Sequence, residues 1–156
     1  MQGGVSDLLV ILLALALVAA AVGDLRTRTI PNWLTLAVAL SAIPFWWATD
    51  LSLWPDVAWR IGIALLVFAI FAGAFALGLM GGGDVKLLAA IALWLPPAAV
   101  MMLVVIMSLA GGALTLAMAI RHRMAKRKDQ LEIPYGVAIA FGGLWLIGER
   151  FLNQFG

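Results

Sequence analysis

Apolar runs of near-membrane length, separated by short polar segments, constrain the fold of this chain more than any other feature. The runs cover residues 8–22, 33–48, 57–79, 85–95, 98–120 and 133–152. A helix needs about 20 apolar residues to cross a bilayer. The 156 residues are 65% hydrophobic and only 12% charged, whereas soluble domains carry about a quarter charged residues. The sequence therefore predicts an all-α, polytopic membrane protein with a single membrane-embedded domain over residues 1–156.

The number of spans depends on the run 85–95, which is short and is followed by two prolines. Cytoplasmic loops are enriched in Lys and Arg. If all the runs cross the membrane, most basic residues fall on one side: Arg26, Arg28, Lys86, Arg121, Arg123, Lys126, Arg127 and Lys128. If the short run does not cross, the cluster 121–128 falls opposite Arg26 and Arg28. We therefore predict six transmembrane helices, with both termini on the non-cytoplasmic side.

Tryptophan residues lie near the ends of several predicted spans, at Trp33, Trp46, Trp47, Trp54 and Trp94. Trp is enriched at both membrane–water interfaces, because one end of its ring is apolar and the other is polar. We therefore expect these side chains to anchor the spans at the interface and to have no role in a site.

The residue counts exclude several kinds of chemistry. The chain has no Cys, which excludes disulfides, thiol nucleophiles and zinc sites built on Cys. Its one histidine, His122, lies in the basic segment RHRMAKRK, where a solvated side chain is expected rather than a metal ligand or a partner for a catalytic Ser. We expect no metal ion and no cofactor. The basic segment 121–128 is expected to set the topology and to contact anionic lipid head groups, with no nucleic-acid partner.

Asp24 and Asp84 are the two carboxylates that local context explains least. Both are placed at the cytoplasmic end of a predicted span, and charged groups at membrane depth are costly and usually functional. Each also has a structural interpretation. Asp24 could pair with Arg26 or Arg28, and Asp84 could be the N-cap of the fourth helix.

A pair of carboxyl groups at one depth has a definite chemistry. Two neighbouring carboxylates cannot both ionise cheaply, so the pair holds a proton. The ionised member can then take a proton from water, and the protonated member can donate to a carbonyl oxygen. This arrangement supports hydrolysis of an amide without a metal ion or a nucleophilic side chain.

Three glycines, Gly81, Gly82 and Gly83, directly precede Asp84. Glycine tolerates positive φ and close approach of another backbone, so an extended substrate peptide could lie against them. A flexible turn that only joins two helices is the alternative. The segment GLMGGGDVKLL lacks the Gly-Lys-Ser/Thr ending of a phosphate-binding loop.

Three segments together resemble the type IV prepilin peptidases, which are membrane aspartic proteases with a Gly-x-Gly-Asp signature. They are GDLRTRTIPNWLT, GLMGGGDVKLLAAIALW and IPYGVAIAFGG. The resemblance implies that Asp24 and Asp84 are the catalytic pair and that Gly81 and Gly83 are signature glycines. Lys86 matches a basic position without an assigned role. Pro134, Tyr135 and Gly136 match a late block for which a structural role is expected.

The resemblance also implies a substrate and a location. Such enzymes cut the basic leader from pilin-like precursors at the cytoplasmic face of the bacterial inner membrane. The larger members add an N-terminal region and a loop with zinc-binding cysteines, and they also methylate the new pilin N-terminus. This chain has no cysteine, so it resembles the short, peptidase-only kind associated with tight-adherence (Flp-type) pili, and we expect no methyltransferase activity. Archaeal preflagellin peptidases share the core.

Two other functions are compatible with the same residues. A small transporter or channel could use the two Asp groups as a proton or cation pathway, which predicts carboxylates near the bilayer midplane. A structural membrane subunit could use them only as helix caps, which predicts carboxylates that lie apart and point away from each other.

Overall fold

The computed structural model describes the backbone of residues 2–124 and 133–155, and the side chains of residues 4–124 and 133–150. Within these ranges the chain is entirely helical with connecting turns and contains no β-strand, which confirms the predicted all-α class. The basic segment predicted to face the cytoplasm lies only partly in this region. Its first residues, Arg121 to Arg123, belong to the last turn of a helix, and residues 125–128 lie outside the described part.

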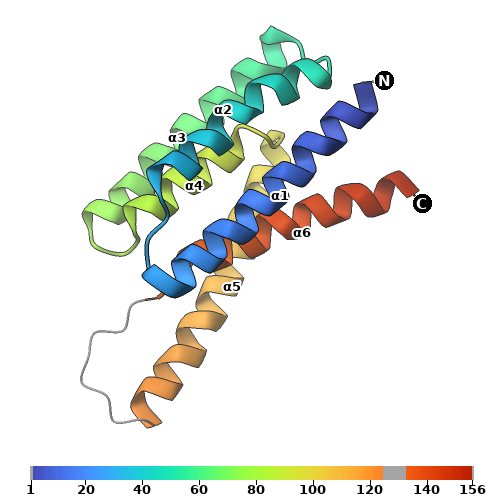
Figure 1. Ribbon diagram of the computed structural model, residues 1–156. Coiled ribbons are helices and arrows are strands. Elements are labelled where there is room, and N and C mark those ends of the chain that lie inside the picture. Colours follow the sequence, from blue (N-terminus) through green and yellow to red (C-terminus); the bar gives the residue numbers. More distant parts are fainter. Residues whose placement is uncertain (1, 125–132, 156) are drawn as a thin grey trace.

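The helices follow the predicted apolar runs closely (Figure 1). They are α1 (Gln2–Thr27), α2 (Asn32–Ala48), the short turn η1 (Leu53–Val57), α3 (Ala58–Ala76), α4 (Gly82–Ala92), α5 (Pro97–Met124) and α6 (Tyr135–Phe155). The largest difference is at α1, which extends beyond its predicted run at both ends, and α4 begins at Gly82, so part of the glycine stretch forms its first turn.

Among the described residues, three segments are long and apolar enough to cross a membrane: Gly4–Thr27, Leu53–Ala76 and Pro97–Met124. The apolar helix α2 is shorter, at 17 residues. With 11 residues, α4 is about 16 Å long, well below the thickness of a bilayer core. The composition and these helices indicate a membrane protein, and the crossing of all six helices stays a prediction.

The short helix α4 occupies the centre of the bundle. It packs against α2 and α3 on one side and against α6 on the other, while α1 packs against α2 and α6, and α5 packs mainly against α6. Leu87 and Leu88 are completely buried and Ile91 nearly so. A helix that is apolar on most of its surface is stable in such a position, because neighbours cover it.

Two tryptophans predicted to lie at the membrane interface tie α2 to α4. Trp94 is buried and donates its indole N–H to the carbonyl of Val38, at 2.9 Å. Trp46 donates to the carbonyl of Leu93, at 2.8 Å. The burial of Trp94 contradicts an interface anchor at that position, whereas Trp46 is only partly buried and its place at the interface stays a prediction. Trp33, Trp47 and Trp54 are exposed, as an interface position requires.

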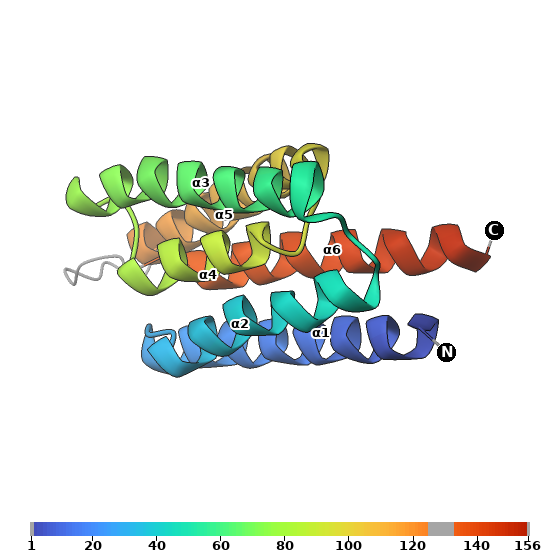
Figure 2. The ribbon, with the colours of Figure 1, turned by 90° about the horizontal axis from the view of Figure 1, so that it is seen from above.

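The two termini lie at one end of the bundle, and the α1–α2 and α3–α4 connections lie at the other (Figure 2). The second end therefore brings together the C-terminus of α1 and the N-terminus of α4. Asp24 and Asp84 both lie there, and so do Arg26, Arg28 and Lys86.

Candidate functional site

Asp24 lies in the last turns of α1 with its carboxyl group inside the bundle. The residue is only 4% exposed, whereas its neighbours Leu25 and Arg26 face outward. The carboxylate faces the backbone N–H groups of Gly136 and Val137, in the first turn of α6. A helix N-terminus favours negative charge, so α6 supports a carboxylate at this place. Its Oδ2 atom has no hydrogen-bond partner among the described residues and is available to accept one.

Glycine at position 136 makes this contact possible. A Cβ atom there would lie 2.8 Å from Oδ2 of Asp24 and 2.8 Å from Cδ1 of Ile30, closer than real Cβ contacts. Any side chain at this position would therefore push α6 away from Asp24. The late Pro-Tyr-Gly block marked Gly136 in the sequence, but nothing in the sequence indicated that it contacts Asp24.

Asp84 lies in the first turn of α4 and is 7% exposed. The N-cap of α4 is Gly81, so Asp84 is not the N-cap that the structural interpretation required. Its carboxylate instead reaches back toward the N–H of Gly81, as acidic side chains at the third helical position do. This places the carboxyl group at the start of the helix, on the side of the α1–α2 connection.

Both carboxyl groups line one polar cavity of about 210 Å³, here called the aspartate cavity. Its other lining residues come from the α1–α2 connection, the start of α2 and the glycine stretch, and they are Arg28, Thr29, Ile30, Asn32, Gly81, Gly82 and Gly83. One water molecule occupies about 30 Å³ of liquid, so the volume suits a peptide group with water rather than a whole peptide. The structure thus brings together Asp24, Asp84 and the three glycines.

The surroundings of the cavity favour proton sharing between the two carboxyl groups. Two negative charges in one small, largely buried space would repel each other, which favours a single proton shared by the pair. The described residues form no ion pair with either carboxylate, which excludes the pairing of Asp24 with Arg26 or Arg28 in this structure. Arg28 lines the cavity with an exposed side chain and adds a favourable longer-range charge.

The glycine stretch allows close packing rather than unusual backbone angles. Gly81 has a φ of −73°, and the positive φ of this turn belongs to Gly78, at +73°. A Cβ on Gly83 would lie 3.1 Å from Cβ of Ile30, and one on Gly82 would lie 3.3 Å from the ring of Phe75. The glycines therefore let α3 and the α1–α2 connection approach the start of α4. A role in holding substrate stays a prediction.

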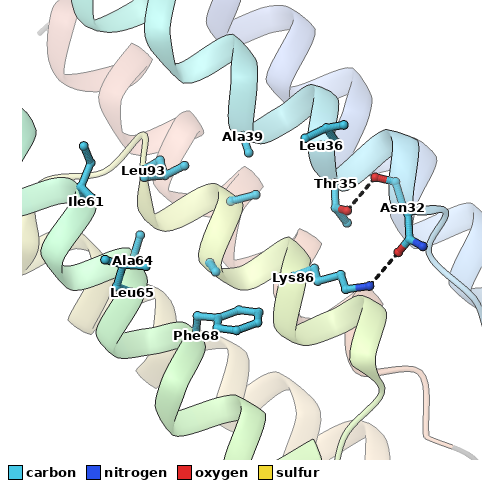
Figure 3. A pocket seen from close by; sticks show the side chains of 12 residues that line it. Asn32, Thr35, Leu36, Ala39, Ile61, Ala64, Leu65, Phe68, Lys86 and Leu93 are labelled. Atoms are coloured by element: carbon cyan, nitrogen blue, oxygen red, sulfur yellow. Dashed lines mark hydrogen bonds between the residues drawn. The ribbon is translucent and has the colours of Figure 1, made fainter.

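Lys86 and Asn32 join α4 to α2 beside the cavity. The Lys86 ammonium donates a hydrogen bond to Oδ1 of Asn32, at 2.9 Å (Figure 3). Asn32 also lines the aspartate cavity. In the sequence, Lys86 indicated the topology and matched a basic position without an assigned role. Nothing there singled out Asn32, although Asn32 belongs to the Ile-Pro-Asn segment after Asp24.

The remaining late-block residues have packing roles. Pro134 is fully buried, and the ring of Tyr135 lies against Gly111 of α5, where a Cβ would be 3.3 Å from it. Among the described residues, no three His, Cys, Asp or Glu side chains gather closely enough to hold a metal ion.

The fold and the site define an apolar, all-helical protein in which two helices each contribute a buried carboxyl group to one polar cavity. A sequence profile of the type IV leader peptidase family matches residues 11–116, which is more than half of the chain. The chain belongs to the type IV leader peptidase family. The match includes Asp24 and Asp84 and ends before Gly136. Neither the curated proteins nor the solved structures contain a significant match to it.

Proposed function

We propose that this protein is a membrane aspartic endopeptidase that removes the N-terminal leader of type IV prepilins, with Asp24 and Asp84 as the catalytic pair. The observation that carries the proposal is the shared aspartate cavity, into which α1 and α4 each contribute one buried carboxyl group. Membership of the leader peptidase family supports the substrate class. The cavity supports the chemistry, since two carboxyl groups that share a proton can supply both the base and the acid for hydrolysis of a peptide bond.

In the proposed reaction, the ionised carboxylate takes a proton from water as its oxygen adds to the carbonyl carbon of the scissile peptide. The protonated partner gives its proton to the carbonyl oxygen, which produces a gem-diol. One diol hydroxyl then returns a proton to the pair while the peptide nitrogen takes one, and the C–N bond breaks. The products are a carboxylic acid on the leader and a free amine on the mature pilin.

We propose that the substrate backbone binds along the glycine stretch. Gly81, Gly82 and Gly83 line the cavity beside Asp84 and carry no side chains that would block an extended peptide. The neighbouring backbone of Ile30, which lies against Gly83, supplies further peptide groups at the same wall.

We further propose that all six helices cross the bacterial inner membrane and that the aspartate cavity faces the cytoplasm, within a single domain over residues 1–156. Two observations support this topology. Both chain ends lie at one end of the bundle, and Arg26, Arg28 and Lys86 lie at the other, beside the cavity (Figure 2). Basic residues mark the cytoplasmic side.

The proposed substrates are Flp-type precursors with a basic leader in the cytoplasm and one apolar helix in the bilayer. Their scissile bond then lies near the inner membrane surface, at the depth of the cavity. We propose peptidase activity alone, because the chain has no cysteine for the zinc-binding loop implied for the methylating members.

The transporter alternative receives less support. Asp24 lies in the last turns of α1 and Asp84 in the first turn of α4, so both are near helix ends and not halfway along a span. Proton or cation flux into vesicles that contain the purified protein without any peptide would favour this alternative.

The central experiment co-expresses the protein with pilin-like precursors and follows their mass. We expect one precursor to lose its leader only when the active protein is present. Asp24→Asn and Asp84→Asn should each lower cleavage by at least about a thousandfold, because each removes an acid–base partner. Near-normal cleavage by either variant, at equal protein levels, would exclude the catalytic pair.

A further inference from the structure

A second cavity, here called the lateral groove, runs along α4 between α2 and α3 (Figure 3). Its volume is about 480 Å³, and all three helices line it. On α4 its residues are Lys86, Ala89 and Ala90, and Leu93 caps the end of the helix; all four share one face over two turns. The groove therefore follows α4 away from the aspartate end of the bundle.

The groove combines small residues with larger apolar ones. Ala39, Ala64, Ala89 and Ala90 contribute only methyl groups. Small residues of this kind let another helix approach closely in lipid. Large apolar side chains from α2 and α3, among them Leu36, Leu65 and Phe68, flank them and are exposed. This shape suits a row of side chains on a guest helix.

The groove and the aspartate cavity share one lining residue, Asn32. Its hydrogen bond to Lys86 marks the end of the groove nearest to Asp84. A chain that leaves the aspartate cavity past Asn32 therefore meets an apolar surface at once. Polar groups lie only at this end of the groove, on Asn32, Thr35 and Lys86.

We propose that the lateral groove binds the first two turns of the substrate's own membrane helix, directly after the scissile bond. This assignment rests on the proposed peptidase function and deepens it. A leader peptidase has to hold an extended peptide group at Asp24 and Asp84 while the rest of the precursor stays helical in lipid. The groove provides that second surface at the place where the chain must re-enter the bilayer.

The groove then contributes to the affinity for the whole precursor but not to the chemical step. It also makes Lys86 and Asn32 the boundary at which the substrate changes from extended to helical. A substitution that fills the groove should therefore weaken precursor binding and leave the reaction of a short peptide intact.

The first test compares Ala89→Phe and Ala39→Phe with wild type on two substrates. One is the full pilin-like precursor identified by its mass change, and the other is a short peptide that spans its scissile bond without the apolar helix. We expect the KM for the precursor to rise at least about tenfold, which corresponds to about 1.4 kcal/mol. The kcat/KM for the short peptide should stay within about twofold of wild type, a change below about 0.5 kcal/mol.

The matched control is Ala117→Phe on α5, which adds the same ring at an exposed position outside the groove. This variant should have the wild-type KM for the precursor and the wild-type kcat/KM for the short peptide. Equal losses on the two substrates, or an unchanged KM for the precursor, would overturn the groove assignment and leave the peptidase proposal intact. If wild type cleaves neither substrate, the peptidase proposal fails and the groove assignment fails with it.

A second test does not depend on a bulky substitution. A photo-crosslinking amino acid at Leu36 or Leu65, in the Asp84→Asn protein, should capture the uncleaved precursor in membranes. The same probe at the exposed Leu116 of α5 should not. Capture of lipid alone, of a second copy of this chain, or of another membrane protein would each overturn the proposal.

Discussion

Gly136 shows how one absent side chain positions a carboxyl group. The N-terminus of α6 approaches Asp24 so closely that a Cβ on Gly136 would lie 2.8 Å from the carboxylate oxygen Oδ2. The position of Asp24 in the aspartate cavity therefore depends on a residue outside the segment that matches the family profile. The positions of the Asp24 carboxylate and of the α6 N-terminus therefore depend on each other.

Gly136→Ala should lower kcat/KM for leader cleavage by more than about tenfold, because α6 and the Asp24 carboxylate must move apart. Gly148→Ala is the matched control. It lies in the same helix with open space around its Cβ position, and it should keep normal activity. The measurement is kcat/KM for leader cleavage by the two variants at equal protein levels. A fully active Gly136→Ala protein would contradict the contact between Gly136 and Asp24.

Sequence reasoning found the two aspartates and the glycine stretch but not the residues that position them. Asp24 and Asp84 are conspicuous because carboxylates at span ends are costly in an otherwise apolar chain. Gly136 and Asn32 are not, since a glycine or an asparagine near a helix start has many ordinary roles. Their contacts with Asp24 and Lys86 depend on how distant helices pack, which no local pattern encodes.

Helix α4 is held in the bundle through the indole groups that cross from one helix to the next. Trp94, in the turn after α4, donates to the Val38 carbonyl of α2, and Trp46 of α2 donates to the Leu93 carbonyl at the end of α4. The rings of Phe45 and Trp94 lie 4.7 Å apart between their centroids. These contacts hold the end of α4 opposite Asp84.

Trp94→Phe should destabilise the protein by about 1 kcal/mol, because it removes the N–H donor while most of the ring packing stays. The Val38 carbonyl then keeps the Ser41 hydroxyl as its only side-chain donor among the described residues. Thermal unfolding in detergent should show a lower Tm for this variant. The same change at the exposed Trp47 should have no measurable effect, and equal effects at both positions would contradict a specific role for Trp94.

The elements themselves were largely predictable, and their partners were not. Apolar runs gave the helices within a few residues, because hydrophobic length decides where a chain can be helical in lipid. The start of α4 was placed too late, since glycines were expected to lie outside the helix, whereas Gly82 and Gly83 form its first turn. Trp94 was misplaced because an indole N–H is satisfied equally by a lipid head group and by a backbone carbonyl.

At the scale of the whole molecule, the absence of cysteine in the sequence allows a clean test of topology. Leu79 lies in the exposed turn before Gly81, and Ala98 is exposed at the start of α5. In intact cells, a membrane-impermeant thiol reagent should label Ala98→Cys and should not label Leu79→Cys until the cells are opened. If α4 did not cross, both positions would lie on the same side and would be labelled alike.

The opening of the lateral groove toward the surface of the bundle has a pharmacological consequence. The side chains that flank it are apolar and exposed, so in a membrane they face lipid rather than water. A small molecule that occupies the groove would therefore arrive from the hydrocarbon phase. Its apparent potency would follow its partition coefficient and the amount of membrane in the assay, more than its concentration in the aqueous buffer.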